Sequence, residues 1–243
     1  MKIATWNVDR VRPGTGARTS RIRAAISSIP ADIWVLTETH SKFQLSEVYE
    51  LVASSSAAAD RGPDECWVSI WVRRSLHATR SDVSGEPNRS ASVLVPGNAK
   101  RDLLVFGTVL PWRGDTATAE RGANKFVKSL GAQAKDWARV SDPARPTDIC
   151  IAGDFNQEVT ANGPVGTLLG RAALNQVLEV QKLTCVTSGD RDPLKKWRAS
   201  IDHIVLSTQS IHRVRGSVIW PNQYPIPTNM PDHHGVCVEL ADT

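Results

Sequence analysis

The sequence predicts a single α/β domain, spanning residues 1–243, in which two sheets pack as a sandwich. Short apolar runs rich in Val, Ile and Trp, typical of strands, alternate with longer segments whose apolar residues recur at helical spacing. Each loop is followed within a few residues by another apolar run, so no stretch resembles an interdomain linker. A chain of 243 residues is long enough to bury a large core in one such domain.

The elements follow in order from these patterns. Helices are expected where apolar positions recur at helical spacing, at residues 20–29, 118–140 and 166–178, and Pro30 stops the first of them. Clusters of Ser, Gly, Pro and Asn predict loops at residues 54–59, 84–89 and 221–231. The runs expected to form strands are residues 2–8, 33–36, 66–72, 91–95, 103–110, 148–152, 201–206, 213–220 and 235–240.

Composition limits the class of protein. Lys and Arg total 29 against 25 Asp and Glu, a net charge of +4, which is compatible with a polyanionic partner without identifying one. The chain has no apolar run long enough for a secretory signal or a membrane span, so we expect a soluble, cytoplasmic protein. The cysteines are far apart and lack paired metal spacing, so we expect buried reduced thiols at Cys66, Cys150, Cys185 and Cys237.

Polar side chains gather where predicted strands end. Asn7 and Asp9 share one face at the end of the first strand, because successive side chains of a strand alternate. The same spacing aims Asp154 and Asn156 alike after residues 148–152, and Glu38 follows residues 33–36. Isolated buried carboxylates and amides cost free energy unless they are paired or bind a cation, so this placement predicts a site.

Two further polar groups precede predicted strands. Asp202 and the pair Asp232-His233 lie where the chain enters residues 201–206 and 235–240. In an antiparallel sheet the end of one strand and the start of the next meet at the same rim. One edge is therefore expected to collect all these groups in an acidic pocket.

Five short motifs carry a resemblance to a known family. Residues 5–9 (TWNVD), 36–39 (LTET), 153–156 (GDFN), 200–204 (SIDHI) and 232–236 (DHHGV) are similar, in order and separation, to those of the endonuclease/exonuclease/phosphatase superfamily. Each motif alone is weak, but their combination covers essentially the whole chain. The resemblance, which extends to abasic-site endonucleases and related phosphodiesterases, implies a deoxyribonuclease-I-like fold: a four-layer α/β/β/α sandwich of two mixed, mainly antiparallel sheets flanked by helices.

The resemblance also implies magnesium-dependent hydrolysis of a phosphate ester, with Mn²⁺ able to substitute. It makes Glu38 the principal metal ligand, with Asp9 and Asp232 contributing directly or through water. Asn7 and Asn156 then position carboxylate, water or phosphate, and Asp154 orients or deprotonates the attacking water. The remaining catalytic pair is His233, facing the phosphate, and Asp202, fixing the imidazole.

General chemistry asks for the same residue types. Mg²⁺ prefers oxygen ligands and keeps several waters, so one or two carboxylates and a substrate phosphate suffice to hold it. A rim rich in acids and poor in cysteine suits magnesium better than zinc. A carboxylate partner at Asp202 would raise the pKa of His233 and favour imidazolium, but the sequence leaves open whether Asp154 or His233 takes the proton from water.

One position departs from the family pattern. The superfamily usually presents a Tyr or His toward the phosphate between the strand at residues 103–110 and Pro111, and this chain has Val109 there. Thr108, Trp112 and Arg113 are candidate replacements. With Val109 in place of this donor, the chain could also be a catalytically weakened member of the superfamily that binds nucleic acid without cleaving it.

Basic and aromatic residues near the motifs point to the substrate. Trp112-Arg113 and Lys196-Trp197-Arg198 place cations beside aromatics, which suits a phosphate backbone with bases that stack. We therefore expect a nuclease acting on nucleic acid as a monomer, with a phosphomonoesterase or phosphodiesterase of a lipid, inositol or other small phosphate ester as the runner-up. Five further arginines follow the first motif, either as substrate contacts or as the solvated face of a helix: Arg10, Arg12, Arg18, Arg21 and Arg23.

Simpler explanations exist for single residues. Asp9 and Glu38, taken alone, are more often turn or capping acids, and residues 153–156 resemble an ordinary Asx turn. His203 faces opposite Asp202 by strand alternation, and His234 points away from His233 in an extended chain, so both are expected outside the site.

Overall fold

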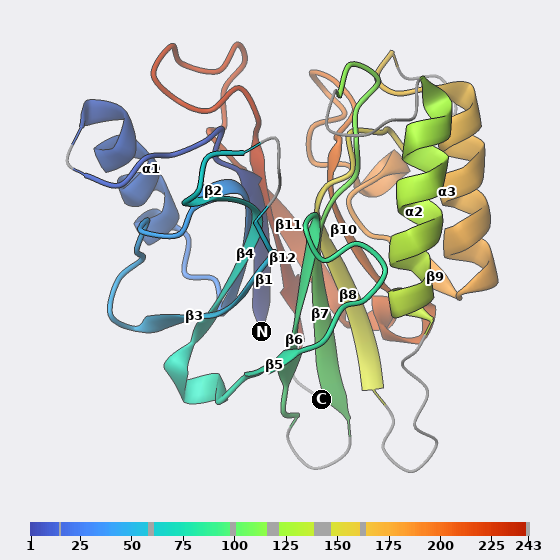
Figure 1. Ribbon diagram of the computed structural model, residues 1–243, viewed down its shortest axis with the longest axis horizontal. Helices are drawn as coiled ribbons and strands as arrows, with labels where there is room; N and C mark the ends of the chain where they lie inside the picture. Colours follow the sequence, from blue (N-terminus) through green and yellow to red (C-terminus); the bar gives the residue numbers. More distant parts are fainter. Residues whose placement is uncertain are drawn as a thin grey trace.

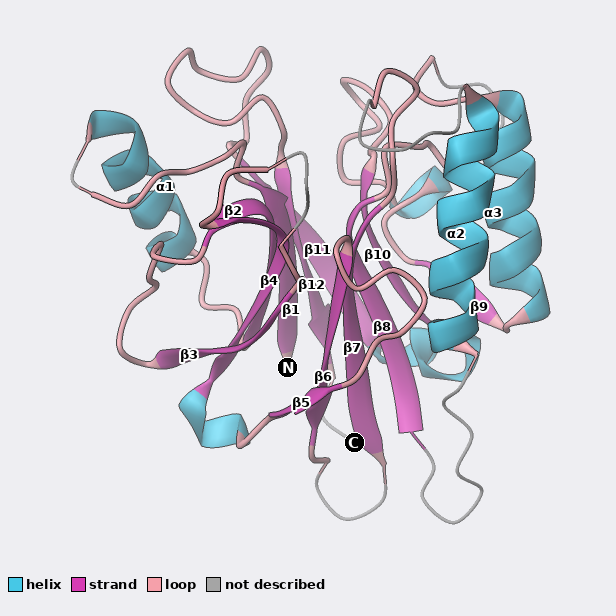
Figure 2. Ribbon diagram, viewed as in Figure 1, coloured by secondary structure: helices cyan, strands magenta, loops and turns pink. Residues whose placement is uncertain are grey.

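The protein is a sandwich of two six-stranded sheets with helices on both outer faces (Figure 1). This computed structural model describes residues 1–14, 16–57, 61–97, 101–115, 122–138, 147–160 and 164–241. The helices are α1 (Ala17–Ser28), α2 (Ala123–Trp137) and α3 (Leu168–Val180). Figure 2 shows α1 on one side of the strands and α2 with α3 on the other.

The strand order of both sheets fits the predicted mixed topology. The first sheet runs β11 (Val214–Trp220), β12 (Gly235–Leu240), β1 (Lys2–Asn7), β2 (Ile33–His40), β4 (Glu65–Arg73), β3 (Tyr49–Ser54). The second runs β5 (Thr79–Ser81), β6 (Ser90–Val95), β7 (Asp102–Val109), β8 (Thr147–Asp154), β10 (Asp202–Ser207), β9 (Leu183–Cys185). The pairs β1–β2 and β7–β8 are parallel and the other described pairs are antiparallel, so the predicted fold class is confirmed.

Side-chain alternation divides the core into layers. Along β1, Ile3 packs between the two sheets, whereas Ala4 and Trp6 pack on the opposite face against α1. On the other side of the sandwich, Phe106 of β7 packs against Phe126 of α2. Because Asn7 is in phase with Ile3, the strand directs its amide toward the space between the sheets.

Three strands were not predicted from the sequence: β3, β5 and β9. Each lies at the edge of its sheet, where only one side is paired, and β5 and β9 are three residues long. β3 carries Glu50 and the exposed Leu51, which break the apolar pattern of a central strand. Short, half-solvated edge strands give a weak signal because few of their side chains need to be buried.

The predicted helices exist with shifted ends. α1 begins three residues early, α3 is shifted by two residues, and α2 lies inside the predicted 118–140, whose ends at 118–121 and 139–140 are outside the described residues. The predicted loops at 84–89 and 221–231 contain no helix or strand. The remaining predicted loop, residues 54–59, starts at the last residue of β3, Ser54. Its residues 58 and 59 are outside the described residues.

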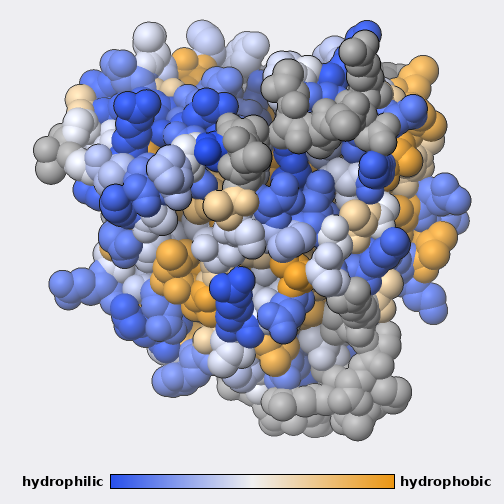
Figure 3. All heavy atoms as spheres, viewed as in Figure 1, coloured by the Kyte–Doolittle hydropathy of each residue, from blue (hydrophilic) through white to orange (hydrophobic). Residues whose placement is uncertain are grey.

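The cysteines are buried, as expected, and the exterior is mainly polar. All four cysteines are buried and free. Most of the face seen in Figure 3 is hydrophilic, with hydrophobic residues in scattered small groups. Within the described part of the chain, no helix combines the length and apolar character that crossing a membrane requires.

Gly153 is required by the close approach of β7 to β8. Its φ is +145°, and a Cβ built there would lie 1.9 Å from the carbonyl oxygen of Thr108. Gly153→Ala should therefore destabilise the protein by about 3 kcal/mol in urea unfolding, through backbone strain and the clash. Gly131→Ala, in α2 with nothing within 4 Å of its added Cβ, is the control and should change stability by about 1 kcal/mol in the stabilising direction.

Candidate active site

Asn7 connects the two sheets at the rim where β1 ends. Its Nδ2 donates to Glu38 Oε1 at 3.1 Å and to Asp154 Oδ2 at 3.0 Å. The parallel pairing of β1 with β2 sets Asn7 opposite Thr37, which brings Glu38 to the same edge. Asn7 Oδ1 accepts from the backbone N–H of Asp9 at 2.9 Å. The predicted motifs around residues 7, 38 and 154 therefore meet through one buried amide.

Asp202 and His233 complete this group. The antiparallel pairing of β10 with β8 places Asp202 directly opposite Asp154. His233 Nδ1 donates to Asp202 Oδ2 at 2.5 Å. Trp6 Nε1 donates to the backbone carbonyl of His233 at 3.0 Å, which ties the loop before β12 to β1. A carboxylate oxygen of Asp154, a carboxylate oxygen of Asp202 and a ring nitrogen of His233 lie within 4.8 Å of one another.

Burial and mutual charge shift two pKa values in this group. Burial and the neighbouring Asp202 carboxylate raise the pKa of Asp154 to about 7. Burial alone would lower the pKa of His233, but the carboxylates of Asp202 and Asp154 outweigh it and raise this pKa to about 10. At neutral pH the imidazole is therefore a cation with both nitrogens protonated.

Several residues of the site have strained backbones. Asp9, Arg10, Glu38 and Asn156 have φ values between 46° and 54°, in the left-handed region that side chains other than glycine rarely adopt. Such strain costs about 1–3 kcal/mol per residue and persists where the surroundings enforce it, often at functional sites. Phe155 turns back into the core and is fully buried, as the strand spacing predicts.

The three predicted metal ligands differ in their surroundings. Glu38 is mostly buried, whereas the side chains of Asp9 and Asp232 are 53% and 85% exposed. Burial raises the pKa of Asp9, and Asp232 and Glu38 are among the charges that act on it. Among the described residues, these three acids do not form a close group like that of Asp154, Asp202 and His233.

A family comparison agrees with this geometry. Residues 4–227 match the model of the endonuclease/exonuclease/phosphatase family. The chain belongs to this family. No curated protein sequence matches it.

Solved structures share the fold at low sequence identity. An AP endonuclease from Archaeoglobus fulgidus is 17% identical, with a TM-score of 0.69 and coverage of 99% of both chains. The AP endonuclease LMAP from Leishmania major is 16% identical, with a TM-score of 0.69, covering 100% of this chain and 88% of that one. The 3'-5' exonuclease NExo from Neisseria meningitidis is 17% identical, with a TM-score of 0.66, covering 99% and 100%.

This member of the endonuclease/exonuclease/phosphatase family has no polar donor at residue 109. Val109 is fully buried, pairs with Asp154 and packs in the core between the sheets. Thr108 offers no replacement, because its hydroxyl is buried and donates to Gln133 Oε1 at 2.5 Å. Asn156 Nδ2 donates to the carbonyl of Leu110 at 2.9 Å, which ties the loop after β7 to the site.

Lys196 and Trp197, two of the predicted substrate-binding residues, contribute to an aromatic and basic rim. Trp197 stacks on Tyr224 with ring centroids 6.3 Å apart, and Lys196 Nζ lies 4.2 Å from the centroid of the Trp197 ring. Trp197 also lies 5.4 Å from His234, the neighbour of the site histidine. The loop with Trp112, which is 55% exposed, and Arg113 follows β7. Tyr224 was missed from the sequence because its loop has no strand or helix period.

Two histidines lie outside the group of Asp154, Asp202 and His233. His203 is buried, with Nε2 3.1 Å from the carbonyl of Gln157 and Nδ1 3.5 Å from Cys185 Sγ. His234 Nε2 lies 3.1 Å from the carbonyl of Gln223. Neither ring contacts Asp202 through a hydrogen bond among the described residues.

Arginines surround the acids of the site. Arg18 donates to Asp9 Oδ2 at 2.7 Å, and Arg10 Nε lies 3.6 Å from Glu38 Oε2. Arg61, which lies in none of the five motifs, donates to the same Glu38 oxygen from both Nη atoms at 3.1 Å. At least two arginines of the first-motif group thus lie at the site.

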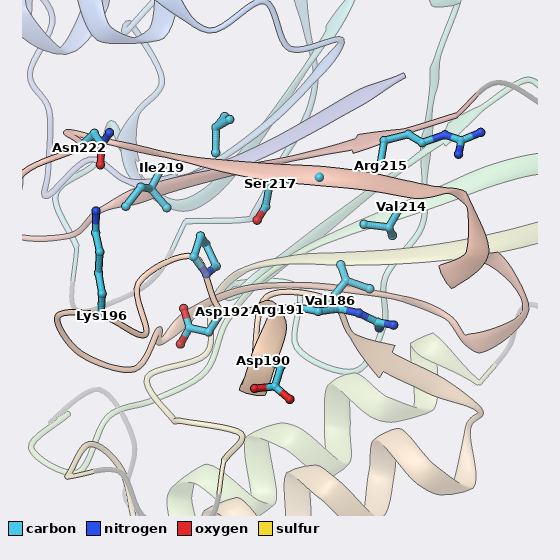
Figure 4. A pocket seen from close by; sticks show the side chains of 13 residues that line it. Val186, Asp190, Arg191, Asp192, Lys196, Val214, Arg215, Ser217, Ile219 and Asn222 are labelled. Atoms are coloured by element: carbon cyan, nitrogen blue, oxygen red, sulfur yellow. The ribbon is translucent and has the colours of Figure 1, made fainter.

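A cavity of about 610 Å³ lies beside the edge strand β11, and its lining contains none of Asp154, Asp202 and His233. Lys196 reaches across it toward Asn222 and Ile219, while Asp190 and Arg191 come from the short 3-10 helix Gly189–Arg191 (Figure 4). Lys196 therefore lies between this cavity and the aromatic rim.

Proposed function

We propose that this protein is a divalent-metal-dependent phosphodiesterase that hydrolyses nucleic acid. The observation that carries the proposal is the bridge from Glu38 through the Asn7 amide to Asp154, beside the short His233–Asp202 hydrogen bond. A phosphodiester needs stabilised phosphoryl charge and an activated water, and this group offers donors and acceptors for both. Family membership supports the same chemistry.

His233 is proposed to stabilise the charge on the phosphate. Its Nδ1–H is taken by Asp202, so Nε2–H, which lies 4.0 Å from Asp232 Oδ1, is the donor left for a phosphoryl oxygen. The pKa near 10 keeps this imidazole protonated at neutral pH, so it has no lone pair with which to deprotonate water. Asp202 orients the ring and favours its cationic form.

Asp154 is then the group proposed to take the proton from the attacking water. A pKa near 7 suits general base catalysis at neutral pH, because the ionised fraction and the basicity are both useful there. Asn7 and the backbone N–H of Asn156, 2.8 Å from Asp154 Oδ1, hold the carboxylate in place. The Asn156 side chain would bind the substrate or water near it.

The acids of the site suit a hard cation. The donors of Glu38, Asp9 and Asp232 are all oxygens, as Mg²⁺ prefers, and one or two carboxylates with waters and a substrate phosphate suffice to hold the ion. These three acids would hold Mg²⁺ or Mn²⁺, and the cation would supply Lewis-acid stabilisation of charge on the phosphoryl oxygens.

Nucleic acid is favoured as the substrate by the rim. Trp197 with Tyr224, and the exposed Trp112 on the loop after β7, offer ring faces on which bases stack, and stacking contributes about 1–3 kcal/mol per base. Arg113, Lys196 and Arg198 are proposed to bind the backbone phosphates. A small phosphate ester would use the cations but not the ring faces.

Metal removal should abolish the activity. Purified protein is expected to cleave plasmid, abasic oligonucleotide or single-stranded RNA with Mg²⁺ or Mn²⁺, and to lose this activity in EDTA, because the acids then lack their cation. Gel analysis of the products, followed by addition of excess Mg²⁺ to restore cleavage, checks the result.

The same screen separates the alternatives. Release of inorganic phosphate from monoesters with diesters untouched would favour a phosphomonoesterase. Binding of nucleic acid in a gel without cleavage under any metal would favour a weakened, binding member, which the absence of a donor at Val109 makes worth testing.

A further inference from the structure

The Arg61 side chain is a buried cation held against Glu38. Its side chain is 2% exposed, and both of its Nη atoms donate to Glu38 Oε2 at 3.1 Å. Its Cζ lies 3.3 Å from the centroid of the Trp67 ring, so the guanidinium rests on an aromatic face. Two independent contacts therefore fix this charge beside the acid.

The strand register makes this arrangement a built part of the site. β2 pairs with β4 through Thr37–Val68 and Thr39–Cys66, so Trp67 occupies the position opposite Glu38. A second arginine, Arg89, also lies over the Trp67 ring at 4.4 Å. Arg89 Nη2 binds Asp115 Oδ2 at 2.5 Å, so its charge is matched by that carboxylate rather than by Glu38.

Both oxygens of Glu38 are already used by donors of the protein. Oε1 accepts from Asn7, and Oε2 accepts from Arg61. Arg61 Nε is buried and has no hydrogen-bond partner among the described residues, so the hydrogen bonds of this guanidinium all go to Glu38. Burial keeps the charge in a low-dielectric region, where its effect on a nearby cation is strong.

We propose that Arg61 is an internal counter-cation that lowers the affinity of the Glu38 site for divalent metal. This inference rests on the proposed function, in which Glu38 is the principal metal ligand. A metal ion approaching Glu38 meets a fixed positive charge and an oxygen whose lone pairs are partly used by two N–H donors. Arg61 therefore acts through Glu38 as a positioning residue and sets the metal concentration at which the protein becomes active.

The test is Mn²⁺ binding in the absence of substrate, measured from the electron paramagnetic resonance signal of free Mn²⁺. Arg61→Gln removes the charge and is expected to bind Mn²⁺ about tenfold more tightly than wild type, because Oε2 is released and the repulsion is lost. Arg61→Lys keeps a positive charge but loses the planar fork that grips Glu38, so its Mn²⁺ affinity should lie between those of wild type and Arg61→Gln. The Mg²⁺ concentration for half-maximal cleavage should fall in parallel for Arg61→Gln.

Arg10 provides the matched control. Its Nε lies 3.6 Å from the same Glu38 oxygen, but its side chain is 59% exposed, so solvent screens its charge. Arg10→Gln should change the Mn²⁺ affinity by less than about twofold. Circular dichroism of each variant reports whether it is folded.

If Arg61→Gln does not fold, wild type still provides a readout. The Nε–Hε resonance of Arg61, identified by its absence in Arg61→Lys, should shift on Mg²⁺ titration at the concentration that saturates the site. A folded Arg61→Gln with equal or weaker Mn²⁺ affinity, or an Arg61 resonance indifferent to Mg²⁺, would overturn the inference and leave the proposed function intact. A wild type that binds no Mn²⁺ and cleaves nothing would overturn both.

Discussion

Asp154→Asn should reduce kcat for nucleic-acid cleavage by about 10³-fold while the protein stays folded, because general base catalysis typically contributes 10²–10⁴-fold. The amide fills the same space next to Asn7 but has a far lower affinity for a proton. Steady-state cleavage of a fluorescent oligonucleotide at saturating Mg²⁺ measures kcat and KM separately. KM should change little, since the carboxylate acts on water rather than on the substrate.

The stability of Asp154→Asn should lie within about 1 kcal/mol of wild type, because two effects oppose each other. The wild-type pKa near 7 exceeds the ordinary value near 3.8, so ionising Asp154 destabilises the fold above pH 7, and this cost disappears as the pH falls below the unfolded value. The amide removes that cost, but its NH₂ group faces the Asn7 donor. Urea unfolding in EDTA compares the two proteins without the stabilisation that bound metal would add.

Asp148 is the matched control for this prediction. It is a buried acid on β8 like Asp154, but at the far end of the strand, where it binds Arg101, Gln209 and Arg213. Asp148→Asn should lose stability, because three donors lose a charged partner, and should keep its kcat. Equal loss of kcat in both variants would mean that the effect of Asp154→Asn comes from the fold, and the proposed base would be wrong.

The fold, and the meeting of Asn7, Asp154 and Asp202 at one rim, were predictable where local periodicity carries the information. Period two in β1 and β8 places Asn7 and Asp154 on the face between the sheets, and buries Phe155 on the other. Because β10 runs antiparallel to β8, the first residue of β10, Asp202, lies opposite the last residue of β8, Asp154. These relations depend on strand direction and alternation, which the apolar pattern of a central strand reveals.

Contacts between distant loops were not predictable in this way. Arg61 lies in the turn before β4, and only the folded chain brings it over Trp67 to Glu38. Tyr224 reaches Trp197 from another loop, and Thr108 is withdrawn from the site by Gln133 of α2. Such contacts are set by tertiary packing rather than by spacing along the chain, so a sequence pattern carries no signal for them.

The pair His233 and Asp202 should act as one unit. His233→Ala removes the proposed phosphate donor and should lower kcat/KM by about 10²–10³-fold, the usual effect of losing one such donor. Asp202→Asn keeps an oxygen for Nδ1–H but removes the charge that favours imidazolium, so we expect a smaller loss, about 10–100-fold. Because most of the effect of Asp202 is expected to pass through the imidazole, the double variant should be only slightly worse than His233→Ala alone, and the Asp202 charge on Asp154 accounts for the remainder.

A double-mutant cycle on kcat/KM of the four proteins tests this coupling. If Asp202 acts only through His233, Asp202→Asn causes no further loss of kcat/KM once the imidazole is absent. The sum of the two single losses, expressed as free energies, then exceeds the loss in the double variant. Losses that multiply would mean that Asp202 acts independently of the imidazole, for instance by its charge on Asp154, to which it is directly opposite. Non-additivity therefore distinguishes an oriented imidazolium from two separate acidic and basic contributions, which the 2.5 Å hydrogen bond alone does not distinguish.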